Sequence, residues 1–363
     1  MPWEKTPLKD REQRLRSGIA TGLGLVAVPG RMSNIGVLSA EVAAEVDDVH
    51  QNLDYRAQQM HTATADEENL VIHAARWGLP RHPATLSKGS VTFAGTDGVT
   101  IGQNTELRHD SGQTFTTDSE VLISAGTAVV AVTAKITGIL RNIADGETLS
   151  PLAPIPGVST EVTVTTAITE GRDQESLDAW RTRLLYRQAH PPMGGADPDY
   201  VVWASMINGV SNVWISPKEQ GLGTVTLRIG AWDDPDGPIP TEALRQSVAD
   251  HIDGHINPVT GQWTGRPAGS EVFVVNPVAK VIDLDFTYLN PDDAPTRAAI
   301  STAVSAMFRK RGKPGVLIRY SWITEAISKA VGEDYHKLAV ADDDVQCGIN
   351  ELPILGLVTV GGA

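Results

Sequence analysis

The chain has 363 residues, enough for about two to three domains that each bury a core of their own. Its formal net charge of -14 argues against a nucleic-acid-binding surface, because neutralising phosphates requires a concentrated basic face. The single cysteine, Cys347, excludes an internal disulfide and favours folding in a reducing cytoplasm. The apolar run 18–28 is too short to span a bilayer and follows a charged stretch, so we expect neither a signal peptide nor membrane insertion.

Residues 1–85 are predicted to be helical. Apolar residues recur at spacings of four, three and four along a helix predicted at 39–59, which places them on one stripe. A second helix is predicted from Ala65, with Leu70, Val71, Ala74 and Trp77 on one face and a stop at residues 78–80. The stripe is consistent with packing inside its own domain or with an intermolecular helical bundle. The candidate partner interface comprises Val42, Val46, Val49, Leu53, Leu70 and Trp77.

Residues 86–170 change to the period-two pattern of β-strands. Val130, Val132, Ala134 and Ile136 alternate with more polar neighbours, and residues 161–169 repeat the pattern with Val162, Val164 and Thr166 facing inward. Glycines fall between these runs, where turns require a positive φ. We expect a small antiparallel β sandwich or barrel.

Residues 171–276 are expected to form an α+β domain. Asp173 is a candidate N-cap for a helix that carries Leu177, Trp180 and Leu184, and Asp197 opens the next helix. Two strands, a helix at 241–255 and a strand at 271–276 follow. The α-β-β-α-β order predicts helices that cover an antiparallel sheet.

Residues 277–363 are expected to form a second α+β domain of the same kind. A half-buried strand at 278–288 precedes a helix that Asp293 and Pro295 open and Gly312 ends. A shorter helix carries Ile323 and Ile327, and two strands at 337–340 and 354–360 close the chain. The fold class is therefore multidomain α+β: N-terminal helices, a β domain and two α+β units.

Two sequence patterns resemble metal sites, but each lacks residues that such a site requires. His251 and His255 have the i,i+4 spacing of zinc proteases, but Ile252 stands where the catalytic glutamate belongs. The acidic run of Asp233, Asp234 and Asp236 lacks both end ligands of a calcium loop. We interpret these as helix-end histidines and an acidic loop tip.

The other candidate sites also have structural explanations. The glycines at 221 and 223 precede a strand, the opposite of the order that a dinucleotide site needs. Arg309, Lys310 and Arg311 fall in the last turn of a predicted helix, where cations offset the partial charge of the helix end. We therefore expect no cofactor, no nucleic acid and no enzymatic activity.

An ordered set of turns and helix starts resembles the baseplate J-like family of contractile phage tails, most closely that of Mu-like phages. These motifs are Gly98 with Ile101, Phe115-Thr116, Gly138 with Asn142 and Gly146, residues 171–176 with Arg181 and Arg183, and Asp199-Tyr200 with Trp203-Ala204. Arg141 departs from the family, in which many members have glycine before the asparagine. The departure concerns one local turn.

The resemblance implies a structural role in the virion tail baseplate, after synthesis and assembly in the host cytoplasm. Implied partners are further copies of the chain, a second wedge protein, the hub and spike, and also sheath and tail-fibre proteins. The wedge would help couple host attachment to sheath contraction. The N-terminal helices would join partner helices in a wedge core.

Two alternatives from other classes remain. A cell-wall-degrading tail enzyme would need a carboxylate pair or zinc ligands in a cleft, and the sequence presents neither convincingly. A receptor-binding fibre or adhesin would fit the β-rich middle, but such fibres usually carry long repeats, which this sequence lacks.

Overall fold

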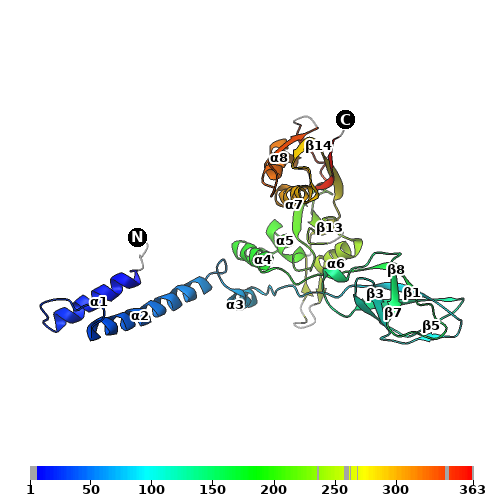
Figure 1. Ribbon diagram of the computed structural model, residues 1–363. Helices are drawn as coiled ribbons and strands as arrows, with labels where there is room; N and C mark the ends of the chain where they lie inside the picture. The colour runs from blue at the N-terminus through cyan, green and yellow to red at the C-terminus, as the bar shows by residue number, and fades with distance from the viewer. Residues whose placement is uncertain are drawn as a thin grey trace. The chain divides into compact units, whose positions relative to one another are not determined.

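The structure is a computed structural model that describes residues 6–234, 237–256, 261, 263–267, 269–339 and 343–361 (Figure 1). The chain divides into two compact units. Residues up to Pro80 and Leu177–Leu185 form the first unit, and Arg81–Ser176 and Tyr186–Ala363 form the second. Residues 177–185, which the sequence analysis placed in the first α+β domain, group with the N-terminal helices. The four domain boundaries set from the sequence stay a prediction.

The first unit is helical, as expected. It contains α1 (Leu8–Gly22), α2 (Asn34–Gln59), α3 (Glu67–Trp77) and the first part of α4 (Leu177–Ala189). Helix α2 begins earlier than predicted, because the Ser33 side chain accepts a hydrogen bond from the Gly36 amide at 3.0 Å. Asp66 caps α3 in the same way, and Gly78 ends it in the left-handed conformation. None of the described helices is long and apolar enough to span a bilayer.

The β domain is a closed barrel, which decides between the two predicted architectures. Its strands are ordered β1-β6-β4-β3-β7-β8. Their bounds are β1 (Lys88–Ala94), β3 (Glu106–His109), β4 (Thr114–Thr117), β6 (Thr127–Ala134), β7 (Thr148–Pro151) and β8 (Val162–Thr169). A short pair, β2 (Thr100–Ile101) and β5 (Val121–Leu122), and the 3-10 helix η1 (Ile139–Arg141) complete it. Every neighbouring pair of barrel strands is antiparallel.

The barrel core places large residues opposite small ones. Phe93 lies opposite Ala128 and Phe115 lies opposite Ala134, and both phenylalanines are fully buried. Thr166 is exposed, contrary to the predicted alternation, because the register of β1 and β8 shifts at this point. The register shifts twice between Val164 and Thr169, so the alternation is interrupted at Thr166 and Ile168 is again on the core side.

The segment between barrel and α4 corrects another expectation. Asp173 does not cap α4, which begins only at Leu177. Its carboxylate instead accepts a hydrogen bond from the Ile139 amide at 3.2 Å, at the start of η1. This bond ties the barrel exit to a turn that lies more than thirty positions earlier in sequence. An aspartate is a typical helix-capping residue, but the tertiary structure determines which helix its carboxylate contacts, and Asp173 contacts η1 and not α4.

The first α+β domain has a mixed sheet and not the predicted antiparallel one. It contains α5 (Asp197–Ala204), β9 (Asn212–Pro217), β10 (Thr224–Gly230), α6 (Glu242–Asp253), β13 (Glu271–Val275) and the short pair β11 (His255–Ile256) with β12 (Trp263–Thr264). Strand β10 is antiparallel to β9 and parallel to β13. The connection from β10 to β13 passes through α6, a crossover that makes its two strands parallel.

The second α+β domain repeats this mixed arrangement. Its elements are β14 (Val278–Asn290), α7 (Ala294–Arg311), β15 (Leu317–Ile318), α8 (Tyr320–Ser328), β16 (Tyr335–Leu338), β17 (Val345–Gln346) and β18 (Glu351–Val360). Strand β14 is central, antiparallel to β16 and parallel to β18. Val340, the predicted end of one strand, lies outside the described residues.

Candidate functional site

Helices α1 and α2 pack against each other through small side chains and ion pairs. The buried residues include Ala20, Ser39 and Ala43. A Cβ added to Gly36 would overlap the backbone of Arg31, so glycine is required for the close approach. Arg11 and Asp47 form an ion pair of 2.9 Å between the two helices. The fully buried positions of the helical hairpin are therefore small or polar, and its large apolar residues Leu15, Ile19 and Ile35 are only half-buried.

The predicted stripe on α2 lies on the outer surface of this hairpin. Val42, Val46, Val49 and Leu53 are between 36% and 57% exposed. Their spacing matches the a and d positions of a helical bundle. A row of four aliphatic side chains in water is unfavourable by about 25 cal/mol per Å² of apolar area that a partner could cover. These four residues, called the α2 stripe below, are the strongest candidate contact surface.

The two predicted interface residues on α3, Leu70 and Trp77, are less exposed than the α2 stripe. Leu70 is fully buried in the chain itself, so it cannot offer free surface to a partner. Val71, predicted on the same face, is exposed, and Trp77 is half-buried. The unit is held by long-range bonds around α3: Trp180 Nε1 donates to the Leu79 carbonyl at 2.9 Å. Leu70 thus belongs to the inside of the unit.

In the second unit, two neighbouring acids after β10 bind cations from different domains. Asp234 forms an ion pair of 3.0 Å with Arg172, which follows the barrel. Asp233 accepts two hydrogen bonds from Arg309 of α7, at 2.6 and 2.9 Å. The acidic run is therefore a junction of the barrel, the first α+β domain and the second. Asp236, also part of the predicted acidic tip, lies outside the described residues.

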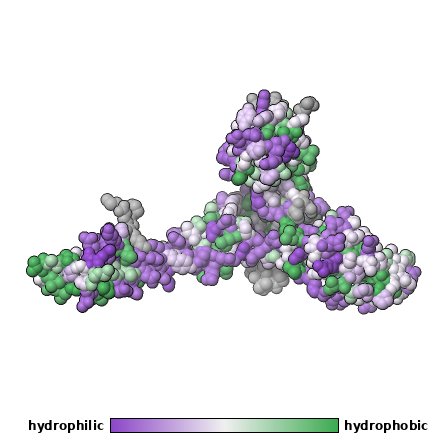
Figure 2. All heavy atoms as spheres, in the orientation of Figure 1, coloured by the Kyte–Doolittle hydropathy of each residue, from purple (hydrophilic) through white to green (hydrophobic). Residues whose placement is uncertain are grey.

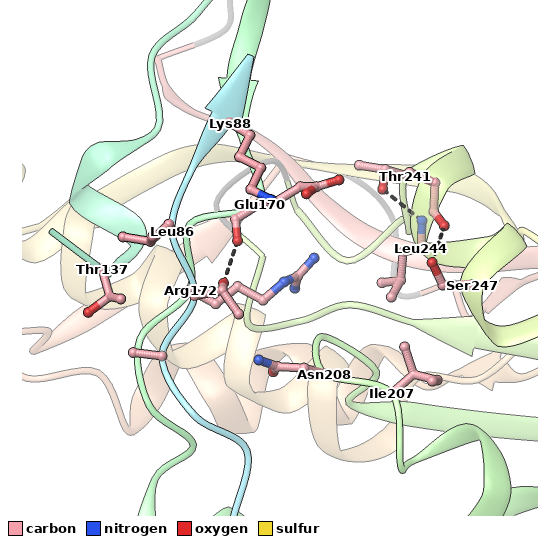
Figure 3. Close-up of a pocket in the computed structure, with 13 residues that line it drawn as sticks. Leu86, Lys88, Thr137, Glu170, Arg172, Ile207, Asn208, Thr241, Leu244 and Ser247 are labelled. Atoms are coloured by element: carbon pink, nitrogen blue, oxygen red, sulfur yellow. Dashed lines mark hydrogen bonds between the residues drawn. The ribbon is translucent and has the colours of Figure 1, made fainter. Parts of the chain in front are cut away.

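A cavity of about 560 Å³, lined by both polar and apolar residues, adjoins Arg172 (Figure 3). It is lined from the barrel side by Lys88 and Glu170 and from the α6 side by Thr241 and Ser247. Among the described residues that line it, Glu170 is the sole carboxylate, so these residues do not supply the carboxylate pair that a glycosidase needs.

Gly209 allows the Arg172 guanidinium to lie against the backbone. Its φ is 102°, and a Cβ there would overlap that guanidinium. We expect Gly209→Ala to lower the free energy of unfolding by roughly 1–3 kcal/mol, from backbone strain and displacement of Arg172. Gly221→Ala is the matched control, because its φ is 123° with no atom within 4 Å. If thermal unfolding showed the same loss of stability in both variants, displacement of Arg172 would not contribute to the effect of Gly209→Ala.

A second junction is built around the buried Arg228 on β10. Its guanidinium donates to both carboxylate oxygens of Glu219, at 2.6 and 2.8 Å, and to Asn350 Oδ1 at 2.8 Å. The hydrogen bonds from Arg228 hold the pKa of Glu219 below its ordinary value. Asn350 precedes β18, so this cluster connects the two α+β domains.

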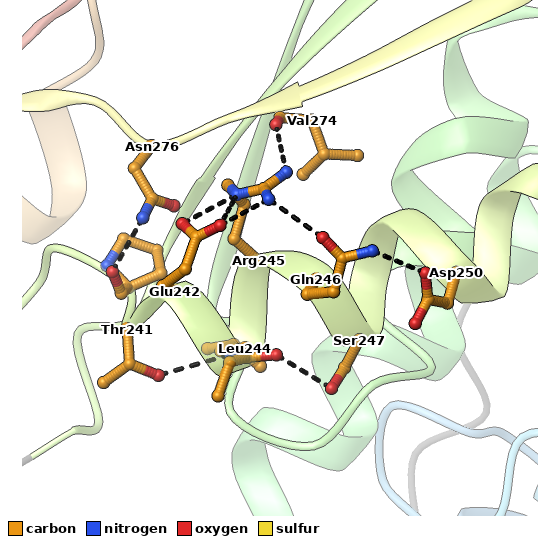
Figure 4. A network of polar contacts seen from close by, with 11 residues as sticks. Thr241, Glu242, Leu244, Arg245, Gln246, Ser247, Asp250, Val274 and Asn276 are labelled. Atoms are coloured by element: carbon orange, nitrogen blue, oxygen red, sulfur yellow. Dashed lines mark hydrogen bonds and ion pairs between the residues drawn. The ribbon is translucent and has the colours of Figure 1, made fainter.

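The predicted helix-end histidines do not assemble into a metal site. His251 lies in the last turn of α6, and within the described ranges no group of three or more His, Cys, Asp or Glu could hold a metal ion. The polar side chains of α6 contact each other and the neighbouring strand (Figure 4). Arg245 donates to the Val274 carbonyl at 3.1 Å, and Gln246 donates to Asp250 at 2.7 Å. The helix is anchored in its domain by these contacts.

One serine, histidine and acid cluster is brought together on the barrel. His109 Nδ1 is 2.7 Å from Ser111 Oγ, and its Nε2 is 2.8 Å from Glu147. In serine proteases the serine faces Nε2 and the acid faces Nδ1, the reverse of this arrangement. Ser111 is exposed in the turn between β3 and β4, and neither it nor His109 lines the cavity described above. The cluster ties this turn to the start of β7.

Comparisons with known proteins identify the architecture. Family models match residues 90–171 as a Baseplate J-like protein barrel domain, 192–276 as a Baseplate J-like central domain and 282–361 as a Baseplate J-like protein C-terminal domain. The Mu-like prophage FluMu protein gp47 of Haemophilus influenzae is 33% identical over 327 residues, 90% of this chain and 91% of the relative. The chain belongs to the baseplate J-like family.

Other relatives of this baseplate J-like protein agree with that assignment. The baseplate protein gp47 of Escherichia phage Mu is 32% identical, over 78% of this chain and 79% of its own. A baseplate structure of the anti-feeding prophage aligns over 96% of this chain and 89% of that one, with 12% identity and a TM-score of 0.44, which is too low to support an inference. The family confirms the resemblance seen in the sequence and a structural role in a phage tail baseplate.

Sequence reasoning missed several contacts of this baseplate J-like protein. Helix α1 was not delimited, because its charged residues hid the face that packs on α2. The ion pairs of Asp233 and Asp234 join residues more than sixty positions apart, so no local pattern marks them. The buried Glu12 had a signal: it stands four residues before Arg16, its ion-pair partner at 3.5 Å.

Proposed function

We propose that this chain is a component of the baseplate wedge that assembles around the hub through its N-terminal helices. The α2 stripe carries this proposal, because its aliphatic side chains stay exposed after α1 has packed on α2 and can be covered by helices of other chains. The partners would be a second wedge protein and further copies of the chain. Hub and spike, sheath and tail-fibre proteins would contact the assembled wedge.

We also propose that the barrel and the two α+β domains form ring contacts that help couple host attachment to sheath contraction. The Asp233–Arg309 link supports this proposal. Both side chains are largely exposed, and exposed ion pairs contribute about 0.2–1 kcal/mol each. Such a junction can open at small cost, as a switch between two packings requires.

The wedge proposal is tested by placing charge on the stripe. Val49→Glu combined with Leu53→Glu should abolish tail assembly, lowering the yield of complete tails at least about 100-fold, because two buried contacts at about 2 kcal/mol each are lost. Both side chains are exposed in the single chain, so the helical hairpin should still fold. Electron microscopy of lysates from the parent particle would count the tails, and circular dichroism would check the helices.

The matched control is Val71→Glu combined with Ile72→Glu on α3. These two residues are as exposed as the stripe, lie in the same unit and receive the same charge. We expect tail yield to stay within a few-fold of the unmodified chain. Complete, contractile tails from the stripe variant would refute the wedge-core role. Such tails, if they also failed to infect, would favour a fibre or a lytic enzyme.

A further inference from the structure

The loop between α1 and α2 exposes a second apolar surface, separate from the α2 stripe. Its large side chains are between 44% and fully exposed: Leu23, Leu25, Val26, Val28 and Met32. Figure 2 shows hydrophobic residues gathered at this end of the hairpin. Five such residues within ten positions form a patch of the kind that marks a contact site in soluble proteins.

Both ends of this loop, called the hairpin tip below, are fixed by specific contacts. The amide of Leu25 donates to the Ala20 carbonyl at 2.9 Å, which ends α1. On the return side, Arg31 forms a bidentate pair with the buried Glu12 of α1. The Ser33 amide donates to the Gly30 carbonyl at 3.1 Å, directly before α2. A loop held in this way loses little conformational entropy when it binds.

The charge around the hairpin tip differs from the rest of the chain. Residues 13–40 contain three arginines and none of the chain's 44 acidic residues. Arg16 and Arg31 are paired with Glu12, whereas Arg14 is exposed. The hairpin tip is therefore apolar, and every charged residue in the flanking segment 13–40 is positive, on a chain of net charge -14. Complementary potentials select an occupant with negative charge around an apolar pocket.

We propose that the hairpin tip docks into an apolar pocket rimmed by carboxylates on a different protein of the baseplate. The inference rests on the proposed function, because it requires that the chain is built into a baseplate. Val26 and Met32 would enter the pocket, and Arg14 would face its acidic rim. The rim makes a second copy of the tip a poor occupant, because like charges would then meet.

A membrane surface fits these residues less well than a protein. One exposed arginine contributes about 1 kcal/mol of attraction to anionic lipid, and stable membrane anchoring needs two independent signals. The arginines paired with Glu12 are already partly neutralised. We therefore expect no flotation of the full chain with phosphatidylglycerol and phosphatidylcholine vesicles. Flotation that depends on Val26 and Met32 would overturn the proposal in favour of lipid.

The direct test is photo-crosslinking in assembled tails, with a benzoylphenylalanine in place of Val26. Illumination of purified tails should give one adduct with another baseplate protein, and the linked peptide should lie beside Asp or Glu residues. The same probe in place of the exposed Gln58 on α2 is the control and should not give that adduct. Complete tails show that the chain assembles, whichever adduct forms, so the wedge role is judged separately.

A charge reversal at the rim gives the second measurement. Arg14→Glu should lower the yield of the Val26 adduct by about threefold to tenfold, because an attraction becomes a repulsion. An unchanged yield would refute the acidic rim. Complete tails in which Val26 links to a second copy of this chain, or to nothing, would overturn the docking proposal itself.

Discussion

Replacing Phe93 by alanine is expected to remove about 3–5 kcal/mol from the stability of the barrel. Phe93 is fully buried, and the residue opposite it on β6 is Ala128, which cannot fill the space that the ring leaves. A domain of about 80 residues has a total stability on the order of 4–12 kcal/mol. The variant should therefore populate an unfolded barrel at moderate temperature, while the helical unit stays folded.

Hydrogen exchange measured by mass spectrometry would localise this effect, because the chain has several parts that can unfold separately. Amides of β1 and β6 should exchange much faster in Phe93→Ala, and those of α2 should not. Leu122→Ala on β5 removes an exposed apolar side chain from the same domain and should cost less than about 1 kcal/mol. Equal losses in the two variants would show that Phe93 is not a core position.

Helices and their ends could be predicted where the pattern is local. The apolar spacing and the stop at residues 78–80 located α2 and α3, and Asp293 and Gly312 bound α7 as expected. The sheets could not be predicted to the same degree. A bulge in β8 and the crossover through α6 arise from strand pairing between distant segments, which no local period records.

The contact surface was only partly visible in the sequence. The spacing of the α2 stripe marked an apolar face, but it could not show whether α1 covers that face. Packing decides this: α1 contacts α2, Ala43 is fully buried, and the stripe residues stay exposed. Leu70 had the same type of spacing and is buried inside the unit. Periodicity in the sequence identifies an apolar helix face, but only the tertiary packing shows whether that face is buried in the chain or exposed to a partner.

Replacing Arg228 by methionine is expected to cost about 3 kcal/mol and to loosen the junction of the two α+β domains. Methionine keeps much of the side-chain volume but leaves Glu219 charged and without its bidentate partner. The Arg228 side chain is 4% exposed and that of Glu219 is 22% exposed, so water only partly replaces the lost bonds. Asn350 also loses its contact, so amides of β10 and of the start of β18 should exchange faster.

The control is Arg309→Met, which removes another bidentate pair between an arginine and a carboxylate. Its two side chains are 45% and 59% exposed, so the loss should stay below about 1 kcal/mol. Equal losses in the two arginine variants would show that burial at Arg228 does not matter.

The pH dependence gives an independent measurement of the Arg228 junction. The hydrogen bonds from Arg228 lower the pKa of Glu219 below its ordinary value of 4.5. The carboxylate therefore contributes its full stabilisation of the fold at pH values above that ordinary pKa. That contribution is lost as the pH falls through the lowered pKa of the folded state. The difference in unfolding free energy between the unmodified chain and Glu219→Gln should be constant near neutral pH and should shrink below about pH 4.5. If the difference kept its neutral value at lower pH, the Arg228–Glu219 charge pair would not be its source.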